Sequence, residues 1–161
     1  MSAAFEALLP LLAGAGVEFI IVGGAAATAH GSARLTQDLD IVYRRTPENL
    51  VAIITALGPH KPYLRGAPPG LPFDWSERTL KNGLNFTLTT LVGDIDLLGQ
   101  IAGGGGYEEL LPHSVQLRLY GTECQCLGLE KLIQVKRAAG RPKDFESIAE
   151  LEAILEERQE S

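Results

Sequence analysis

A chain of 161 residues is long enough for one domain with a sizeable core, because a domain of ~150 residues buries about 68–70% of the surface of its unfolded chain. Hydrophobic residues make up 45% of the sequence and charged residues 21%, which is ordinary for a globular protein. The formal net charge of −6 does not favour non-specific binding to nucleic acid, although a local basic patch could still bind RNA.

The sequence also indicates where the protein is located and in which state its cysteines are. The N-terminus has no basic segment of the signal-peptide type, and no apolar run is long enough to span a bilayer. We therefore predict a cytoplasmic protein with no membrane partner. Cys124 and Cys126 are the only cysteines and lack the four ligands of a structural zinc site, so we expect reduced, structural thiols.

The chain opens with a predicted scaffold helix and then enters its central motif. Apolar residues at helical spacing predict the helix over residues 3–12, with a kink or an end at Pro10. Residues 19–22 are a short apolar run typical of a buried strand, and Gly23 and Gly24 break it. Two glycines let the backbone turn sharply and bring its N–H groups close to a ligand. The helix predicted after them would favour an anion at its N-terminus.

A second predicted strand carries two aspartates on one face. Residues two apart on a strand point the same way, so Asp38 and Asp40 lie side by side while Leu39 and Ile41 face a core. Neighbouring carboxylates repel each other, and a hard divalent cation such as Mg²⁺ relieves that repulsion. The alternative interpretation is a pair of solvated aspartates on an exposed face.

Residues 93–98 repeat the pattern of carboxylate and apolar residues. Residues 84–91 read as a strand that forms a hairpin with them. If this second strand lies beside the first, Asp38 and Asp40 meet one of Asp94 or Asp96. Three carboxylates around phosphate-bound metal ions suit phosphoryl or nucleotidyl transfer.

Three further residues near the motif have competing interpretations. Arg34 and Thr36 come just before the metal-binding strand, where a guanidinium could hold triphosphate oxygens. A surface ion pair is the equal alternative for Arg34. For His30, a core or helix-end position is favoured over a ligand role.

The middle of the chain contains one clear helix and one irregular stretch. Thr46 as N-cap and Pro47 at the first position predict a helix to about residue 57. Residues 59–75 hold five prolines, so a long loop or lid is expected there. Its Phe73 and Trp75 fit a packed position better than base stacking, and for its Arg65 the sequence favours neither a structural nor a functional role.

The remaining elements are a hairpin and two helices. Glycines 103–106 predict a flexible turn, and residues 107–111 a short helix. Residues 115–120 and 123–127 alternate as a second hairpin. A helix is predicted from Leu129 to Gly140, and another from Pro142 into an acidic tail. Several basic residues gather in this segment, either facing phosphates or forming a solvated face.

The order of these motifs resembles the nucleotidyltransferase superfamily that includes DNA polymerase beta and kanamycin nucleotidyltransferase. More closely, the sequence is similar to the bacterial AbiEii-like group, known from abortive-infection and toxin–antitoxin systems. The resemblance rests on short segments that are spread over most of the length of the chain: residues 22–24, 34–40, 94–98, and a late segment of residues 128–133 followed by 136–144. One departure is visible, because the group often has an aspartate where this chain has Ser147.

The resemblance implies one α/β (α+β) domain over residues 1–161. A mixed β-sheet would carry the carboxylates, flanked by helices, with a core over about 1–127 and C-terminal helices over about 128–158 closing a cleft. The implied reaction moves an NMP from an NTP to a hydroxyl of RNA, tRNA, a protein or a small molecule. A cognate antitoxin is a possible partner.

The resemblance also assigns roles to individual residues. Asp38, Asp40 and Asp96 would hold Mg²⁺ or Mn²⁺, and Asp96 would also align or deprotonate the acceptor hydroxyl. Lys136 and Arg141 match conserved basic positions and would neutralise the pyrophosphate. Gly23 and Gly24 would present N–H groups to the β- and γ-phosphates, beside Arg34 and Thr36. The alternative is a non-catalytic nucleotide- or partner-binding module on the same fold.

Overall fold

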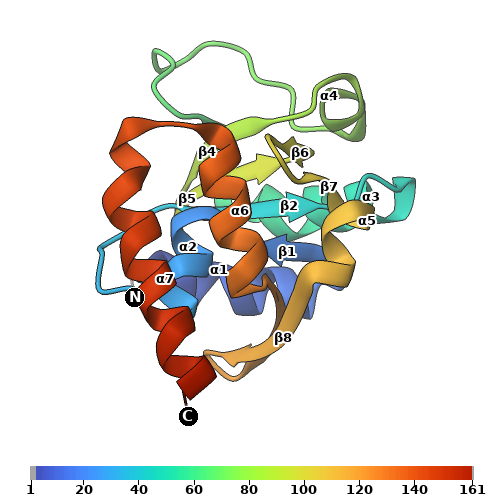
Figure 1. Cartoon of the computed structure of the whole chain (residues 1–161). Helices are drawn as coiled ribbons and strands as arrows, with labels where there is room; N and C mark the ends of the chain where they lie inside the picture. The colour runs from blue at the N-terminus through green and yellow to red at the C-terminus, as the bar shows by residue number, and fades with distance from the viewer. Residues whose placement is uncertain (1–2, 161) are drawn as a thin grey trace.

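A seven-stranded mixed sheet in the order β3-β4-β5-β2-β1-β9-β8 forms the centre of the molecule (Figure 1). The computed structural model describes residues 3–160. The strands of this sheet are β1 (Phe19–Ile21), β2 (Leu39–Tyr43), β3 (Tyr63–Leu64), β4 (Phe86–Thr90), β5 (Gly93–Leu98), β8 (Ser114–Leu119) and β9 (Thr122–Leu127). A separate two-stranded sheet pairs β6 (Gln100–Ile101) with β7 (Gly105–Gly106).

The pairing of the central strands fixes where the carboxylates lie. Strand β2 runs parallel to β5, and β1 runs parallel to β9, whereas the other neighbours are antiparallel. In the β2–β5 pair, Leu39 lies opposite Ile95 and Asp40 lies opposite Asp96. Leu39 and Ile95 are fully buried. The alternation of each strand therefore sends its apolar residues into the core and its carboxylates to the other face.

The helices are α1 (Ala3–Gly14), α2 (Gly23–Ala29), α3 (Pro47–Leu57), α4 (Glu77–Asn82), α5 (Tyr107–Leu110), α6 (Leu129–Ala139) and α7 (Phe145–Glu160). Their ends follow local chemistry. The Thr46 hydroxyl accepts from the Asn49 backbone N–H and caps α3, and Gly140 ends α6 with a left-handed φ of 65°. Helix α1 continues through Pro10, because Leu12 beyond it is fully buried in the core.

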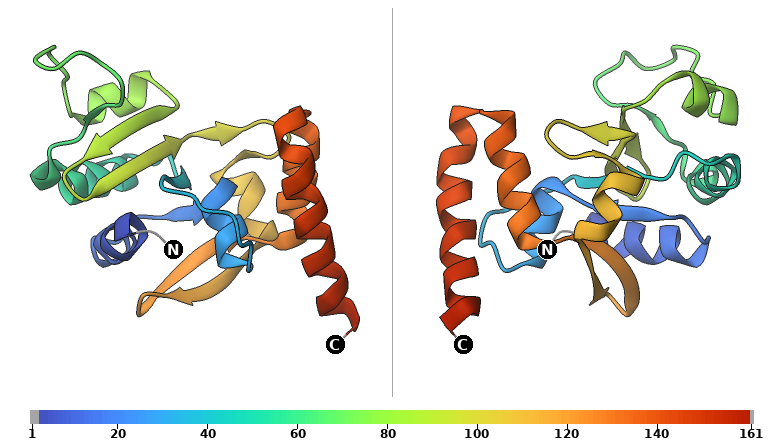
Figure 2. Two further views of the ribbon diagram at one scale, coloured as in Figure 1. Left: turned by 90° about the vertical axis from the view of Figure 1, so that its left-hand side faces the viewer. Right: turned by 45° about the vertical axis from the view of Figure 1, so that its right-hand side comes forward.

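The helices occupy two sides of the molecule. Helix α1 packs against β2, β5 and β9 and contacts α3, while α2 packs against β2 and α6. Figure 2 shows α1 and α3 on the side away from the paired helices α6 and α7. Close packing joins α6 to the turn between β6 and β7, because a Cβ on Gly103 would lie 2.4 Å from the Cβ of Ala138. Residues of α6 also line the same cavity as Asp40 of β2 and Asp96 of β5, which places this helix near the polar face of the two strands.

The predicted α+β fold is confirmed, and so are the two hairpins, β4–β5 and β8–β9. Two stretches differ from the sequence-based expectation. The proline-rich stretch contains strand β3, and the glycine segment pairs as β7 with β6 instead of forming only a turn. Within residues 3–160, no helix is both long and apolar enough to cross a membrane.

Candidate active site

Four aspartates from β2, β5 and the residue before β2 form one cluster, which we call the carboxylate cluster: Asp38, Asp40, Asp94 and Asp96. Parallel pairing in register places Asp40 directly beside Asp96 on the same face of the sheet. The two strands that carry the aspartate motifs are therefore neighbours, which is the condition under which the sequence brings three carboxylates together. The cluster contains both Asp94 and Asp96, between which sequence alone left a choice.

Asp40 has the most perturbed acid–base behaviour in the cluster. Burial raises the pKa of Asp40 to about 7, helped by a hydrogen bond shared with the Asp96 carboxyl and by the negative charges of Asp96 and Asp38. The positive charge of Arg65 acts in the opposite direction. A buried carboxyl whose pKa is raised by neighbouring carboxylates marks a place where a cation is favoured.

The backbone turn at Gly23 fits closely around Asp40. Gly23 begins α2 with a left-handed φ of 61°, and a Cβ there would lie 2.3 Å from Asp40 Oδ2. Gly24 is similarly close to Thr36, because a Cβ would lie 3.0 Å from the Thr36 hydroxyl oxygen. Glycine is thus required at Gly23 both by its conformation and by the approach of a carboxylate.

Arg65, which follows β3, inserts its guanidinium into the carboxylate cluster. Its nitrogens lie 3.3 Å from Asp38 Oδ2, 3.3 Å from Asp94 Oδ2 and 3.0 Å from Asp96 Oδ1. The Arg65 side chain is only 26% exposed. The sequence alone predicts no role for this arginine, because its carboxylate neighbours come from other strands.

A divalent metal fits the chemistry of the cluster but not its present geometry. Carboxylate oxygens are the ligands that Mg²⁺ prefers, and Asp96 Oδ1 is buried without a hydrogen-bond partner in the described part of the chain. Across residues 3–160, however, no three His, Cys, Asp or Glu side chains are arranged to hold a metal ion. Arg65 lies among the oxygens that would have to converge on one.

A cavity of about 340 Å³ opens beside the cluster. Asp40, Asp96 and Gly23 line it together with Lys136 and Arg141 from the α6 segment. Its wall is completed by Val22, Asn85, Leu98, Gln100, Ile101, Ala102, Leu127, Leu132, Val135 and Ala139. The structure thus brings together five of the nine residues predicted for the site, and adds the amides of Asn85 and Gln100, for which the sequence offers no motif.

The two basic residues of the cavity are held differently. Arg141 Nε donates to Asp144 Oδ2 at 2.7 Å, and this carboxylate is buried. Asp144, three residues after Arg141 in the chain, thus positions the Arg141 guanidinium. Lys136 is in the last turn of α6 and makes no hydrogen bond or ion pair within residues 3–160. Lys136 is therefore available to an anionic ligand.

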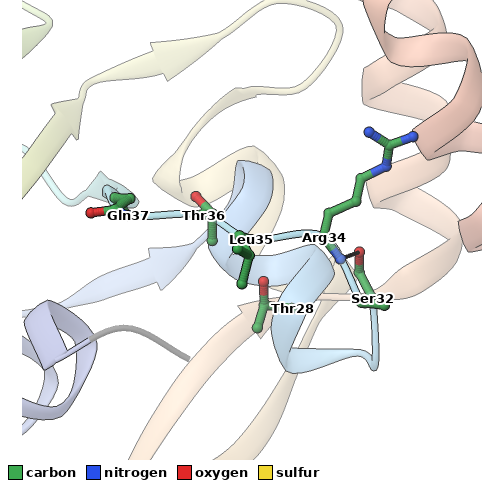
Figure 3. A pocket seen from close by; sticks show the side chains of 7 residues that line it. Thr28, Ser32, Arg34, Leu35, Thr36 and Gln37 are labelled. Carbon is green, nitrogen blue, oxygen red and sulfur yellow. Dashed lines mark hydrogen bonds between the residues drawn. The ribbon is translucent and has the colours of Figure 1, made fainter.

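Arg34 and Thr36 lie apart from this cavity, in a second pocket of about 230 Å³ (Figure 3). Figure 3 shows the Arg34 side chain extending toward the C-terminal helices, where it pairs with Glu146 at 3.0 Å and Glu150 at 3.9 Å. Of the two interpretations of Arg34, the structure shows the surface ion pair. Gly24 and Asp38 also fall outside the residues that line the larger cavity.

The remaining residues considered in the sequence analysis are buried in, or packed against, the core of the fold. His30 caps α2 and is buried, with Nε2 2.7 Å from the Leu127 carbonyl oxygen, and burial lowers the pKa of its imidazole. Both cysteines are buried and free, and burial raises the pKa of the Cys126 thiol to about 12. Phe73 and Trp75 pack against the core, and the Trp75 indole donates to the Ile54 carbonyl at 3.1 Å. A base-stacking role is not favoured for either aromatic residue.

No protein-family model matches this sequence, and no curated protein matches it at a significant level. The chemistry of the site therefore carries the functional argument.

Proposed function

We propose that this protein is a metal-dependent nucleotidyltransferase, which moves a nucleoside monophosphate from an NTP to a hydroxyl acceptor. The observation that carries the proposal is the pairing of Asp40 with Asp96 in a cavity that also contains Lys136 and Arg141. Adjacent carboxylates suit divalent cations, and a lysine and an arginine suit the phosphate oxygens that such cations bridge. A nucleoside triphosphate with its metal ions meets both requirements.

Asp38, Asp40 and Asp96 are the residues that would hold Mg²⁺ or Mn²⁺. The bound ions would supply charge neutralisation on the phosphate oxygens and alignment of the attacking and leaving groups. Burial and the neighbouring carboxylates favour the protonated form of Asp40, so the binding of a cation would favour release of that proton. The backbone N–H groups of Gly23 and Gly24, at the start of α2, have no partner within the helix and would face phosphate oxygens.

The remaining steps belong to the side chains of the cavity. Asp96 would accept the proton of the acceptor hydroxyl as its oxygen bonds to the α-phosphorus of the NTP. The bond from the α-phosphorus to the bridging oxygen breaks, and pyrophosphate leaves with the bond's electron pair. Lys136 and Arg141 would neutralise the negative charge that develops on the pyrophosphate. The acceptor class stays open among RNA or tRNA ends, a protein side chain and a small molecule.

Transfer of label from each α-labelled NTP tests the proposal directly. The protein would be incubated with Mg²⁺ or Mn²⁺ and with total RNA, total protein, an aminoglycoside panel or no acceptor. The Asp38→Ala/Asp40→Ala variant should transfer no label. The matched control is Glu156→Ala/Glu160→Ala, which removes two exposed carboxylates far from the cluster and should behave like the unmodified protein. Label transfer that persists without Asp38 and Asp40 would overturn the assignment.

A second candidate is a non-catalytic nucleotide- or partner-binding module. The ion pairs of Arg65 favour it, because a guanidinium already compensates part of the charge of the carboxylate cluster. The two candidates differ in turnover. Binding of an NTP with no label in any acceptor fraction would support the module, whereas label that depends on the aspartates supports the enzyme.

The resemblance to the AbiEii-like group supports a toxin role with a cognate antitoxin as partner. We would test it by inducing expression in a bacterial host and following growth. Arrest by the unmodified protein, relieved by Asp40→Ala, is the expected result. Arrest that Asp40→Ala leaves unchanged would separate toxicity from the proposed chemistry.

A further inference from the structure

Arg65 is the one cation within the carboxylate cluster in the described part of the chain. It approaches Asp38, Asp94 and Asp96 at 3.0–3.3 Å, from a chain segment outside both aspartate motifs. Asp38 and Asp96 are two of the three residues that would hold the metal. Arg65 therefore lies beside the oxygens that a divalent ion would need.

The backbone of Arg65 is fixed to the sheet. Its N–H donates to the Thr87 carbonyl at 3.0 Å, which continues the pairing of β3 with β4. Its Nη2 donates to the Leu88 carbonyl at 2.7 Å. The side chain thus reaches across β4 to the cluster from a fixed backbone, and rotation of the side chain alone would withdraw the guanidinium.

The contacts of Arg65 with the carboxylates are poorly aligned. Only the contact with Asp38 is a hydrogen bond, and its 3.3 Å length exceeds the ~2.7–2.9 Å of a strong charge-assisted bond. Arg65 Nε and Asp96 Oδ1 are buried without hydrogen-bond partners in the described residues, although each lies near an opposite charge. The Arg65 guanidinium therefore compensates the negative charge of the cluster but leaves hydrogen-bonding capacity of the carboxylate oxygens unused.

A metal ion and Arg65 would compete for this place. Mg²⁺ binds carboxylate oxygens at about 2.0–2.1 Å, which satisfies them better than the guanidinium does. A divalent ion held by Asp38 and Asp96 would lie within a few ångströms of the guanidinium in its present position and would repel it. The guanidinium and a divalent ion would therefore compete for the same carboxylate oxygens.

We infer that Arg65 is a tethered counter-cation, which neutralises the carboxylate cluster in the metal-free protein and must leave it before a divalent ion binds. The inference rests on the proposed function, because it assumes that Asp38, Asp40 and Asp96 bind metal. In this role, Arg65 does not touch the substrate. It sets the concentration of divalent metal at which Asp38, Asp40 and Asp96 bind the ion.

Titration with Mn²⁺, followed by electron paramagnetic resonance of the free ion, tests this inference without an activity assay. Arg65→Gln should bind Mn²⁺ on the order of tenfold more tightly than the unmodified protein, because the competing charge is gone. Its metal-free melting temperature should fall, and saturating Mn²⁺ should restore it to that of the unmodified protein. The matched control is Arg44→Gln, which removes a guanidinium that bridges Glu18 and Glu108 away from the cluster.

Arg65→Lys provides a second variant, which keeps the positive charge and serves as the test should Arg65→Gln fail to fold. Its single ammonium group cannot contact three carboxylates as a guanidinium does, so its Mn²⁺ affinity should exceed that of the unmodified protein. Equal or weaker Mn²⁺ binding by the Arg65 variants, with binding by the unmodified protein intact, would overturn the inference alone. Absence of Mn²⁺ binding in every variant would overturn the proposed function as well.

Discussion

The Asp40 carboxylate lies directly against the backbone of Gly23, so closely that a Cβ on Gly23 would come within 2.3 Å of Asp40 Oδ2. The contact joins the turn after β1 to the centre of the carboxylate cluster. Gly23 thus does more than allow a sharp turn, because it also leaves the space in which Asp40 faces Asp96.

Gly23→Ala should therefore disturb both stability and metal binding. Gly16→Ala is the matched control, because Gly16 has a similar left-handed φ of 78° but open space where its Cβ would lie. We expect Gly16→Ala to lower the free energy of unfolding by about 1–2 kcal/mol through backbone strain alone. Gly23→Ala should lower it by about 1–3 kcal/mol more, through overpacking against Asp40.

Chemical denaturation and Mn²⁺ titration of the two alanine variants give the comparison. Only Gly23→Ala should weaken Mn²⁺ binding, since only its Cβ displaces Asp40. Equal losses of stability in both variants, with unchanged Mn²⁺ affinity, would show that the contact with Asp40 has no role.

Asp40 should make the metal-free protein less stable as the pH rises. The folded-state pKa of about 7 lies above the ordinary value of 3.8, so the folded state favours the protonated carboxyl. This contribution to stability is fully present below about pH 4 and is lost as the pH rises through about 7. Asp40→Asn keeps a neutral side chain of similar shape at every pH.

The difference in unfolding free energy between Asp40→Asn and the unmodified protein, measured from pH 4 to pH 8 in a chelator, tests this sign. The two proteins should be similar near pH 4, and Asp40→Asn should be more stable by roughly 2–4 kcal/mol above pH 7. A difference that does not change with pH would show that Asp40 titrates normally.

The core of the site was predictable because strand alternation is a local property. Two residues that are two positions apart on a strand share a face in any fold, as Asp38 does with Asp40 and Asp94 with Asp96. The sequence did not predict that the two strands pair in parallel, with Asp40 opposite Asp96. That register depends on packing between Leu39, Ile95 and the rest of the core.

The role of Arg65 could not be predicted from its neighbours in the chain. Its position depends on β3, which has only two residues and lies in a proline-rich stretch without a strand pattern. The ion pairs of Arg34 could not be predicted for a related reason, because its partners, Glu146 and Glu150, are more than a hundred positions away in the chain. Contacts of this kind arise from the tertiary fold and leave no local pattern.

Trp75→Phe should reduce stability without affecting nucleotide binding. The variant loses the hydrogen bond from the indole to the Ile54 carbonyl, so the free energy of unfolding should fall by about 1 kcal/mol. Trp75 does not line the cavity beside the cluster, so the Kd for an NTP should be unchanged by calorimetry. Weaker NTP binding at unchanged stability would restore the base-stacking interpretation.

Arg34→Gln and Lys136→Gln should separate the two basic positions. The Arg34 side chain is 48% exposed and pairs with exposed Glu146, so its loss should cost less than about 1 kcal/mol of stability and leave NTP affinity unchanged. Lys136 lines the cavity without a partner in the described residues, so its loss should weaken NTP binding at unchanged stability. Calorimetric titration of both variants with an NTP would measure the two affinities. Weaker NTP binding by Arg34→Gln than by Lys136→Gln would support triphosphate binding by Arg34 instead.

Asp94 and Asp96 allow the sharpest test of the chemistry, because they lie two residues apart on β5 and both pair with Arg65, at 3.3 and 3.0 Å. Only Asp96 lines the cavity and lies opposite Asp40. Asp96→Asn should lower the rate of label transfer at least ~100-fold, since it removes the proton acceptor and a metal ligand. Asp94→Asn removes the same charge from the cluster but should keep most of the transfer. Comparable losses in both variants, measured as initial rates at saturating NTP, would assign the effect to the charge of the whole cluster and not to a proton acceptor at Asp96.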